Sequence, residues 1–266
     1  MKCVVAVAFV LMGVCPLWAQ EAKTDGAPGS TPATVSAAGT QAELTADQKK
    51  IAQMQGQLND WAGLGRYRAA DAALPPPAPG EQRVVFMGDS ITDIWGRLPN
   101  RGKFFPGKPY INRGISGQTT PQMLIRFQQD VVALHPAAVL ILAGTNDIAG
   151  NTGPSTPKMI EDNYTSMADI ASASGIKVIL ASITPAYAYP WRAGVQPVAE
   201  IREVNAWIKQ FCAAHNYTYL DYYDSMADAK GAMLPGYSSD GVHPTTKGFS
   251  VMAPLAEQAI AKALGK

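Results

Sequence analysis

Ser90 stands directly after a short apolar segment, in the run Gly88-Asp89-Ser90. Residues 83–87 are rich in valine and end at Gly88, which is typical of a buried strand followed by a tight turn. A serine hydroxyl is a poor nucleophile unless a base lies beside it. Ser90 could therefore attack a carbonyl carbon only with such a partner, and without one it would cap the next helix.

The 266-residue sequence contains three histidines, and only one of them is expected near Ser90. His135 and His215 each precede a predicted strand, which places them at the amino edge of a parallel sheet. His243 lies between the last predicted strand and the last predicted helix, on the same edge as Ser90. Because ligands of open α/β sheets bind at the carboxyl ends of the strands, we predict His243 as the general base.

Asp240 precedes His243 by three residues, and Gly241 lies between them. The glycine allows the chain to fold back, so that the carboxylate can reach the imidazole Nδ1–H. Such a contact holds the tautomer and stabilises the imidazolium that forms during attack. The alternative is that Asp240 only caps a turn.

Acyl transfer also requires donors directed at the oxyanion, and two residues on the same edge offer them. Gly114 offers a backbone N–H and Asn146 a side-chain amide, with the Ser90 N–H as a third donor. One such donor contributes on the order of 3 kcal/mol to lowering the barrier. Gly114 could equally form a plain tight turn, and Asn146 could stabilise its own turn.

Alternating strands and helices must position these residues. Apolar runs predict strands, and amphipathic stretches between them predict helices. The strands are expected at 83–87, 110–112, 138–143, 177–182 and 218–221, and the helices at about 119–133, 157–174, 197–214 and after Pro244. This order indicates an α/β domain over residues 81–266, with a parallel sheet covered by helices on both faces.

The first twenty residues are expected to be a signal peptide. Lys2 is followed by an apolar run over residues 4–14, which is too short to span a bilayer, and by the small residue Ala19. Lipid modification of Cys15 is disfavoured by the bulky Val14 before it. We therefore expect an exported protein, periplasmic or extracellular, without a transmembrane segment.

Residues 21–43 and 44–80 differ in pattern. The first segment is rich in Ala, Thr, Ser, Gly and Pro and has no periodicity, which predicts a disordered linker. The second predicts a helical extension, with one helix from Thr45 to about Leu58 and another over about 59–74. Once the signal peptide is removed, Cys212 is the only cysteine, and its helical, apolar context predicts a buried thiol.

Composition limits the partners. Lys and Arg total 22 against 21 Asp and Glu, and hydrophobic residues make up 47% of the chain. A near-neutral globular protein of this kind has no basic field for nucleic acid. We expect a small-molecule or polysaccharide ester as substrate, and neither a cofactor nor a metal. The sequence leaves the oligomeric state and the alcohol of the ester open.

Four short blocks occur in a specific order along the chain: Gly88-Asp89-Ser90, Gly114, Gly144-Thr145-Asn146-Asp147, and Asp240-Gly241-Val242-His243-Pro244. Over residues 81–260 they resemble the blocks of the SGNH (GDSL-type) hydrolases, most closely the platelet-activating-factor acetylhydrolase-like branch. The resemblance implies a flavodoxin-like three-layer α/β/α fold with strand order 2-1-3-4-5. It also implies a catalytic triad and an oxyanion hole, formed by Ser90, Asp240 and His243 and by Ser90, Gly114 and Asn146, respectively.

The predicted function is therefore that of an exported serine esterase acting on short acyl esters of a carbohydrate or lipid. Tyr187, Tyr189 and Trp191 follow the fourth strand and could contact substrate, although core packing would explain them as well. Two other functions remain open. One is a metal-dependent phosphoesterase with Asp89, Asp147, Asp240 and His243 as ligands. The other is a non-catalytic carbohydrate-binding module.

Overall fold

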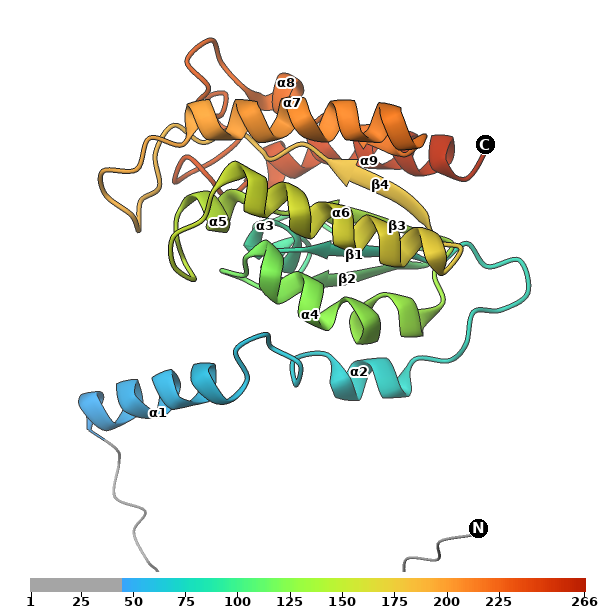
Figure 1. Ribbon diagram of the computed structural model, residues 1–266, viewed down its shortest axis with the longest axis horizontal. Helices are drawn as coiled ribbons and strands as arrows, with labels where there is room; N and C mark the ends of the chain where they lie inside the picture. The colour runs from blue at the N-terminus through green and yellow to red at the C-terminus, as the bar shows by residue number, and fades with distance from the viewer. Residues whose placement is uncertain (1–44) are drawn as a thin grey trace, which may run out of the picture. The chain divides into compact units, whose positions relative to one another are not determined.

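Five short parallel strands form the centre of the molecule (Figure 1). They are β1 (Val84–Gly88), β2 (Tyr110–Gly114), β3 (Ala138–Leu142), β4 (Lys177–Ala181) and β5 (Thr218–Leu220). Their spatial order is β2-β1-β3-β4-β5. The predicted α/β fold and strand order are therefore confirmed in this computed structural model, which describes residues 45–266.

The register of the strands brings their carboxyl ends to one level. Gly88, the last residue of β1, pairs with Gly114 at the end of β2 and with Leu142 at the end of β3. The loops that follow these three strands therefore leave the sheet side by side. This alignment is the reason why residues far apart in the sequence meet at one edge.

Helices cover both faces of the sheet. One face carries α4 (Thr120–Asp130), α6 (Pro157–Ala173) and α7 (Val198–His215), and the other carries α3 (Ser90–Ile94), α8 (Tyr223–Met226) and α9 (Thr246–Ala263). The alternation of side chains along β1 explains this division. Val85 and Met87 pack into the first core, whereas Val84 and Phe86 pack into the second.

The predicted signal peptide (1–20) and linker (21–43) lie outside the described residues, so these two assignments stay predictions. Within residues 45–266, no helix has both the length and the apolar character needed to cross a membrane.

The extension before β1 contains two helices, α1 (Ala46–Asn59) and α2 (Arg68–Ala73). Thr45 begins α1 as its N-cap, as the sequence predicts. The second helix is much shorter than the predicted stretch over 59–74. Gly63 interrupts it with a φ of +71°, and Asp60 folds the turn by accepting hydrogen bonds from Leu64 N and Gly65 N, both at 2.7 Å.

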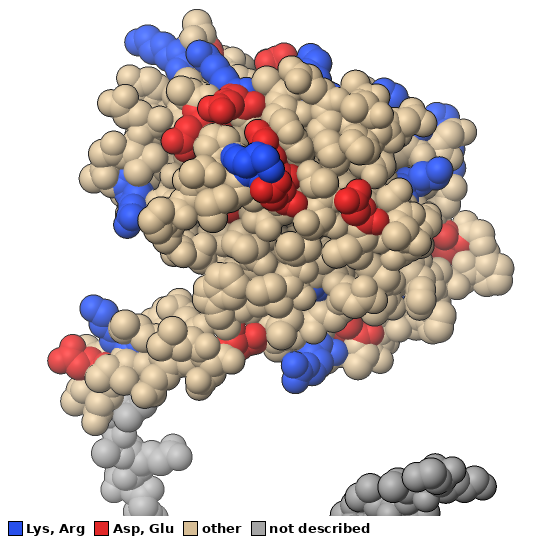
Figure 2. All heavy atoms as spheres, in the orientation of Figure 1, with Lys and Arg blue, Asp and Glu red and all other residues tan. Residues whose placement is uncertain are grey.

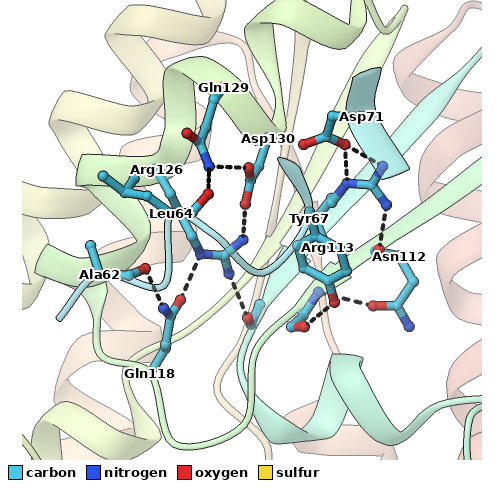
Figure 3. A network of polar contacts seen from close by, with 12 residues as sticks. Ala62, Leu64, Tyr67, Asp71, Asn112, Arg113, Gln118, Arg126, Gln129 and Asp130 are labelled. Carbon is cyan, nitrogen blue, oxygen red and sulfur yellow. Dashed lines mark hydrogen bonds and ion pairs between the residues drawn. The ribbon is translucent and has the colours of Figure 1, made fainter. Parts of the chain in front are cut away.

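Side-chain amides fasten the extension to the sheet domain (Figure 3). Three glutamines of α4 and its preceding loop donate to backbone carbonyls of the extension. Figure 3 shows two of these bonds, from Gln118 to Ala62 at 2.7 Å and from Gln129 to Leu64 at 2.8 Å. The third bond runs from Gln122 to Trp61 at 2.5 Å. Farther along, the Arg113 guanidinium binds the Asp71 carboxylate, with Nε–Oδ1 at 2.9 Å. The turn over residues 61–64 is thus held against α4 from several directions.

Candidate active site

Ser90 is the first residue of α3 and follows β1 after a single intervening residue. Asp89 caps the helix, because its carboxylate accepts the Ile91 N–H at 2.9 Å. Gly88 is required by this tight turn, since a Cβ there would lie 2.2 Å from Thr92 Oγ1. The turn directs the Ser90 hydroxyl toward His243, with Oγ and Nε2 2.9 Å apart.

His243 is bound on its other side by Asp240. The Nδ1 and Oδ2 atoms are 2.6 Å apart, and Asp240 Oδ1 accepts the backbone N–H groups of Val242 at 3.0 Å and His243 at 2.8 Å. Gly241, with a φ of +86°, lets the chain turn back so that one carboxylate makes all these contacts. The structure thus brings Ser90, His243 and Asp240 into one hydrogen-bonded series.

The environment of Asp240 keeps its carboxylate ionised. Partial burial raises its pKa, but the hydrogen bonds from the His243 side chain and from the two backbone N–H groups outweigh burial and lower the pKa below its usual range. An ionised Asp240 accepts a hydrogen bond from the Nδ1–H of His243, which keeps the proton on Nδ1. The other ring nitrogen, Nε2, is then free to accept the hydroxyl hydrogen of Ser90.

Asn146 lies at the end of β3, in the short helix α5 (Thr145–Ile148), and its amide is held in one orientation. Its Oδ1 accepts a hydrogen bond from Asn151 Nδ2 at 2.8 Å, and its Nδ2 donates to the Gln118 carbonyl at 3.0 Å. The second hydrogen on Nδ2 has no partner among the described residues. Asn146 lines the same hollow as Ser90, so this hydrogen is available to a ligand.

The structure corrects the prediction for Gly114. Its N–H donates to the Asn112 side chain at 2.9 Å, and it packs against the backbone of α3 and does not line the hollow. Gly117, three residues later, does line the hollow. Its φ is +81°, and its N–H has no hydrogen-bond partner within residues 45–266.

The three aromatic residues after β4 lie in different places. Trp191 is 42% exposed and lines the hollow, with its ring 5.8 Å from that of His243. Tyr189 is only 2% exposed and shares a 3.0 Å hydrogen bond with Thr145, which favours the alternative of core packing over contact with substrate. Tyr187 is exposed beside Asp240 but lines a separate depression.

A hollow of about 400 Å³ lies above Ser90 and is called the Ser90 hollow below. It is lined by Ser90, Ile94, Leu98, Arg101, Ser116, Gly117, Asn146, Asn151, Trp191 and His243. Arg101 donates from Nη1 to the carbonyls of Pro244 at 2.6 Å and His243 at 3.3 Å. Its guanidinium thus holds the backbone that carries the imidazole.

The residues proposed for metal binding serve other purposes. Asp147 accepts the Thr120 N–H and hydroxyl, and Asp89 caps α3. Burial raises the pKa of Asp89 to about 7. Within residues 45–266, no group of three or more His, Cys, Asp or Glu side chains is placed to hold a metal ion.

The other two histidines and the cysteine lie at the opposite edge of the sheet or inside the core. His135 directly precedes β3 after a short 3₁₀ turn, and His215 ends α7 before β5. Cys212 is buried, as the sequence predicts, and burial raises the pKa of its thiol to about 12.

A buried charge network supports the loops of the site from below (Figure 3). The fully buried Arg126 donates to the Gly88 carbonyl at 3.1 Å, to Gln118 Oε1 at 2.6 Å and to the Asp130 carboxylate at 2.9 Å. It therefore links the strand before Ser90 to the loop that carries Gly117. The amphipathic pattern of this helix did not reveal the role of Arg126. The signal for it in the sequence is the opposite charge of Asp130, four residues later on the same helix.

Comparisons with known proteins identify the family of this chain. Residues 86–251 match the sequence model of the GDSL-like lipase/acylhydrolase family. An acetylxylan esterase of Geobacillus stearothermophilus is 32% identical over 88 residues, which cover 25% of this chain and 40% of that protein. The chain thus spans less than half the length of this curated relative.

Two solved structures match over nearly their full length. A GDSL-like lipase of Bacteroides thetaiotaomicron is 45% identical, with a TM-score of 0.73, over 76% of this chain and 99% of that one. A candidate acylhydrolase of Bacteroides fragilis is 44% identical, with a TM-score of 0.74, over 77% and 98% of the two chains. Because the family model covers more than half of the sequence, this chain belongs to the GDSL-like lipase/acylhydrolase family.

Proposed function

We propose that the chain is an exported serine esterase that hydrolyses short acyl esters of carbohydrates, acetyl esters in particular. The observation that carries this proposal is the series of hydrogen bonds from Ser90 Oγ to His243 Nε2 at 2.9 Å and from His243 Nδ1 to Asp240 at 2.6 Å. In this arrangement Ser90 is the nucleophile, His243 the general base and Asp240 the residue that orients the imidazole.

The reaction begins when Ser90 Oγ attacks the ester carbonyl and His243 Nε2 takes the hydroxyl proton. The same proton passes to the leaving alcohol, which departs and leaves the acyl group on Ser90. Water then attacks the acyl-enzyme, again with His243 as base, and releases the acid. The ionised Asp240 stabilises the imidazolium in both halves of the reaction.

Three donors converge on the position of the oxyanion in this proposal: the N–H groups of Ser90 and Gly117 and the Nδ2 group of Asn146. Both backbone groups lack partners within residues 45–266, and all three residues line the Ser90 hollow. Donors held in place before the reaction stabilise the developing charge without reorganisation. Gly117 takes the role expected of Gly114, whose N–H is bound to Asn112.

The substrate class has two supports. The hollow of about 400 Å³ has an apolar wall formed by Ile94 and Leu98, which suits a short acyl group. The similarity to an acetylxylan esterase favours an acetylated sugar as the ester. Export is supported by the positive charge of Lys2 and the apolar run that follows it over residues 4–14, a pattern typical of a signal peptide.

The test combines hydrolysis of 4-nitrophenyl acetate with a Ser90→Ala variant. We expect the variant to lose at least about 10³-fold in kcat while its circular dichroism spectrum is unchanged. A fluorophosphonate probe should add covalently to Ser90 in the unsubstituted protein, as mass spectrometry of peptides would show. Full esterase activity in the folded Ser90→Ala variant would refute the assignment of the nucleophile.

A further inference from the structure

A second hollow, of about 490 Å³, adjoins the Ser90 hollow and is called the Trp61 hollow. The two hollows share the wall formed by Ser116, Gly117 and Asn151. The far side of the Trp61 hollow is built by the extension before β1, through Gln57 and Trp61. In Figure 2 the surface is notched on the left of the view, where the end of α1 faces the sheet domain.

Trp61 is exposed although its backbone is tightly held. The side chain is 43% exposed, and the residue's carbonyl accepts the Gln122 amide at 2.5 Å. Gln118 holds the next carbonyl, that of Ala62, at 2.7 Å. The indole ring is thus presented to solvent at the edge of the hollow by a rigid backbone, which lowers the entropic cost of binding a ligand there.

The polar lining of the Trp61 hollow is uncharged apart from one satisfied carboxylate. Its polar side chains include Gln57, Gln118, Gln122, Asn151 and Thr152. The one acidic group, Asp60, has both oxygens bound by backbone N–H groups at 2.7 Å. Amide and hydroxyl groups beside an exposed indole suit a neutral, polyhydroxylated ring, because the ring's apolar face packs on the indole while its hydroxyls bond to the polar groups.

We infer that the Trp61 hollow binds a sugar ring of the alcohol part of a carbohydrate ester, while the acyl group occupies the Ser90 hollow. This inference rests on the proposed esterase function of Ser90. In this inference the extension, which lies outside residues 86–251 matched by the family model, selects for carbohydrate esters. The shared Asn151 connects the two hollows, since it also accepts the Trp191 Nε1–H at 3.2 Å.

The test is a Trp61→Ala variant assayed on two substrates, an acetylated xylobiose and 4-nitrophenyl acetate. We expect kcat/KM for the disaccharide ester to fall about tenfold, as loss of one aromatic platform predicts, and to recover in Trp61→Phe. The value for 4-nitrophenyl acetate should stay within about twofold of the unsubstituted enzyme, because this small ester does not reach Trp61.

Leu58→Ala provides the matched control. Leu58 is 77% exposed on the same extension but does not line the hollow, so neither substrate should be affected. Equal losses on both substrates in Trp61→Ala, or no loss on either, would overturn the inference. So would a change of oligomeric state in both variants, which would assign Trp61 and Leu58 to a protein contact.

Failure of the esterase assignment itself would look different. In that case Ser90→Ala would keep its activity on both substrates, whatever Trp61→Ala does. A binding measurement separates the two questions further. Xylobiose titrated into the Ser90→Ala protein should bind about tenfold more tightly than to the Ser90→Ala/Trp61→Ala protein, without any turnover.

Discussion

Asn146→Ala tests the proposed oxyanion site most directly, because it removes the one donor of the three that belongs to a side chain. Removal of a single oxyanion donor raises the barrier by about 2.7–4 kcal/mol, which corresponds to a fall in kcat of about 10²–10³-fold. KM should change little, since the donor acts mainly when charge develops on the carbonyl oxygen. Steady-state kinetics with 4-nitrophenyl acetate would measure both values.

Asn146→Ala should also lower the free energy of unfolding, and a control variant separates this effect from the loss of the oxyanion donor. Asn146 binds the Gln118 carbonyl and the Asn151 amide, and each buried group left without a partner costs about 1–3 kcal/mol of unfolding free energy. Asn205 is a matched control, because its amide makes two bonds, to Ile183 N at 2.7 Å and Ile183 O at 3.0 Å, and does not line the hollow.

Asn205→Ala should therefore lower the thermal midpoint by an amount similar to Asn146→Ala but leave kcat within about threefold of the unsubstituted value. If Asn146→Ala kept kcat within this same range, the amide would have no part in stabilising the oxyanion. If Asn205→Ala lost as much kcat as Asn146→Ala, the loss would reflect weakened folding, and the reasoning about the donor would be refuted.

Two further substitutions test the local structure around Ser90. Gly114→Ala should destabilise the protein by about 1–3 kcal/mol or more in a denaturant titration, because the new Cβ would lie 2.2 Å from Asp93 N. Gly56→Ala is the control and should not destabilise the protein, because a Cβ there meets open space. Equal denaturation midpoints for the two variants would contradict the packing described for Gly114. Asp89→Asn tests the raised pKa of about 7 for the Asp89 carboxyl. Because the folded state binds the carboxyl proton of Asp89 more tightly than the unfolded state does, the stability falls as pH rises from about 4 to 7. The variant should show a smaller fall in thermal midpoint over that range. An unchanged pH dependence would show that Asp89 does not titrate there.

The order of elements and the edge that holds the site could be predicted from the sequence alone. Short apolar runs such as 138–143 are typical of strands buried on both faces of a parallel sheet, and the strands observed begin and end within about two residues of those expected. The carboxyl ends of such strands share an edge. For this reason the position of His243 after the last strand was sufficient to place it near Ser90.

The exact donors and aromatic contacts could not be predicted in this way. Gly114 ends β2 and Gly117 lies three residues later in the loop that follows, and the direction of each N–H depends on backbone angles and on the Asn112 side chain that binds Gly114. Tyr189 and Trp191 are two residues apart, yet one is buried against Thr145 and the other is exposed. Such differences arise from contacts between distant segments, which leave no periodic pattern in the chain.

The extension shows the same division. Its first helix follows from Thr45 and the capping box it forms with Gln48, which are local features of the sequence. Its attachment to α4 depends on glutamine amides that bind backbone carbonyls, and any exposed glutamine in the sequence could have made such a bond. The sequence by itself therefore determined the fold and the edge of the sheet at which Ser90, His243 and Asp240 meet, because these follow from burial, periodicity and strand direction. Only the tertiary structure decided which N–H groups stay free and where Trp61 stands, because those depend on how side chains pair across the molecule.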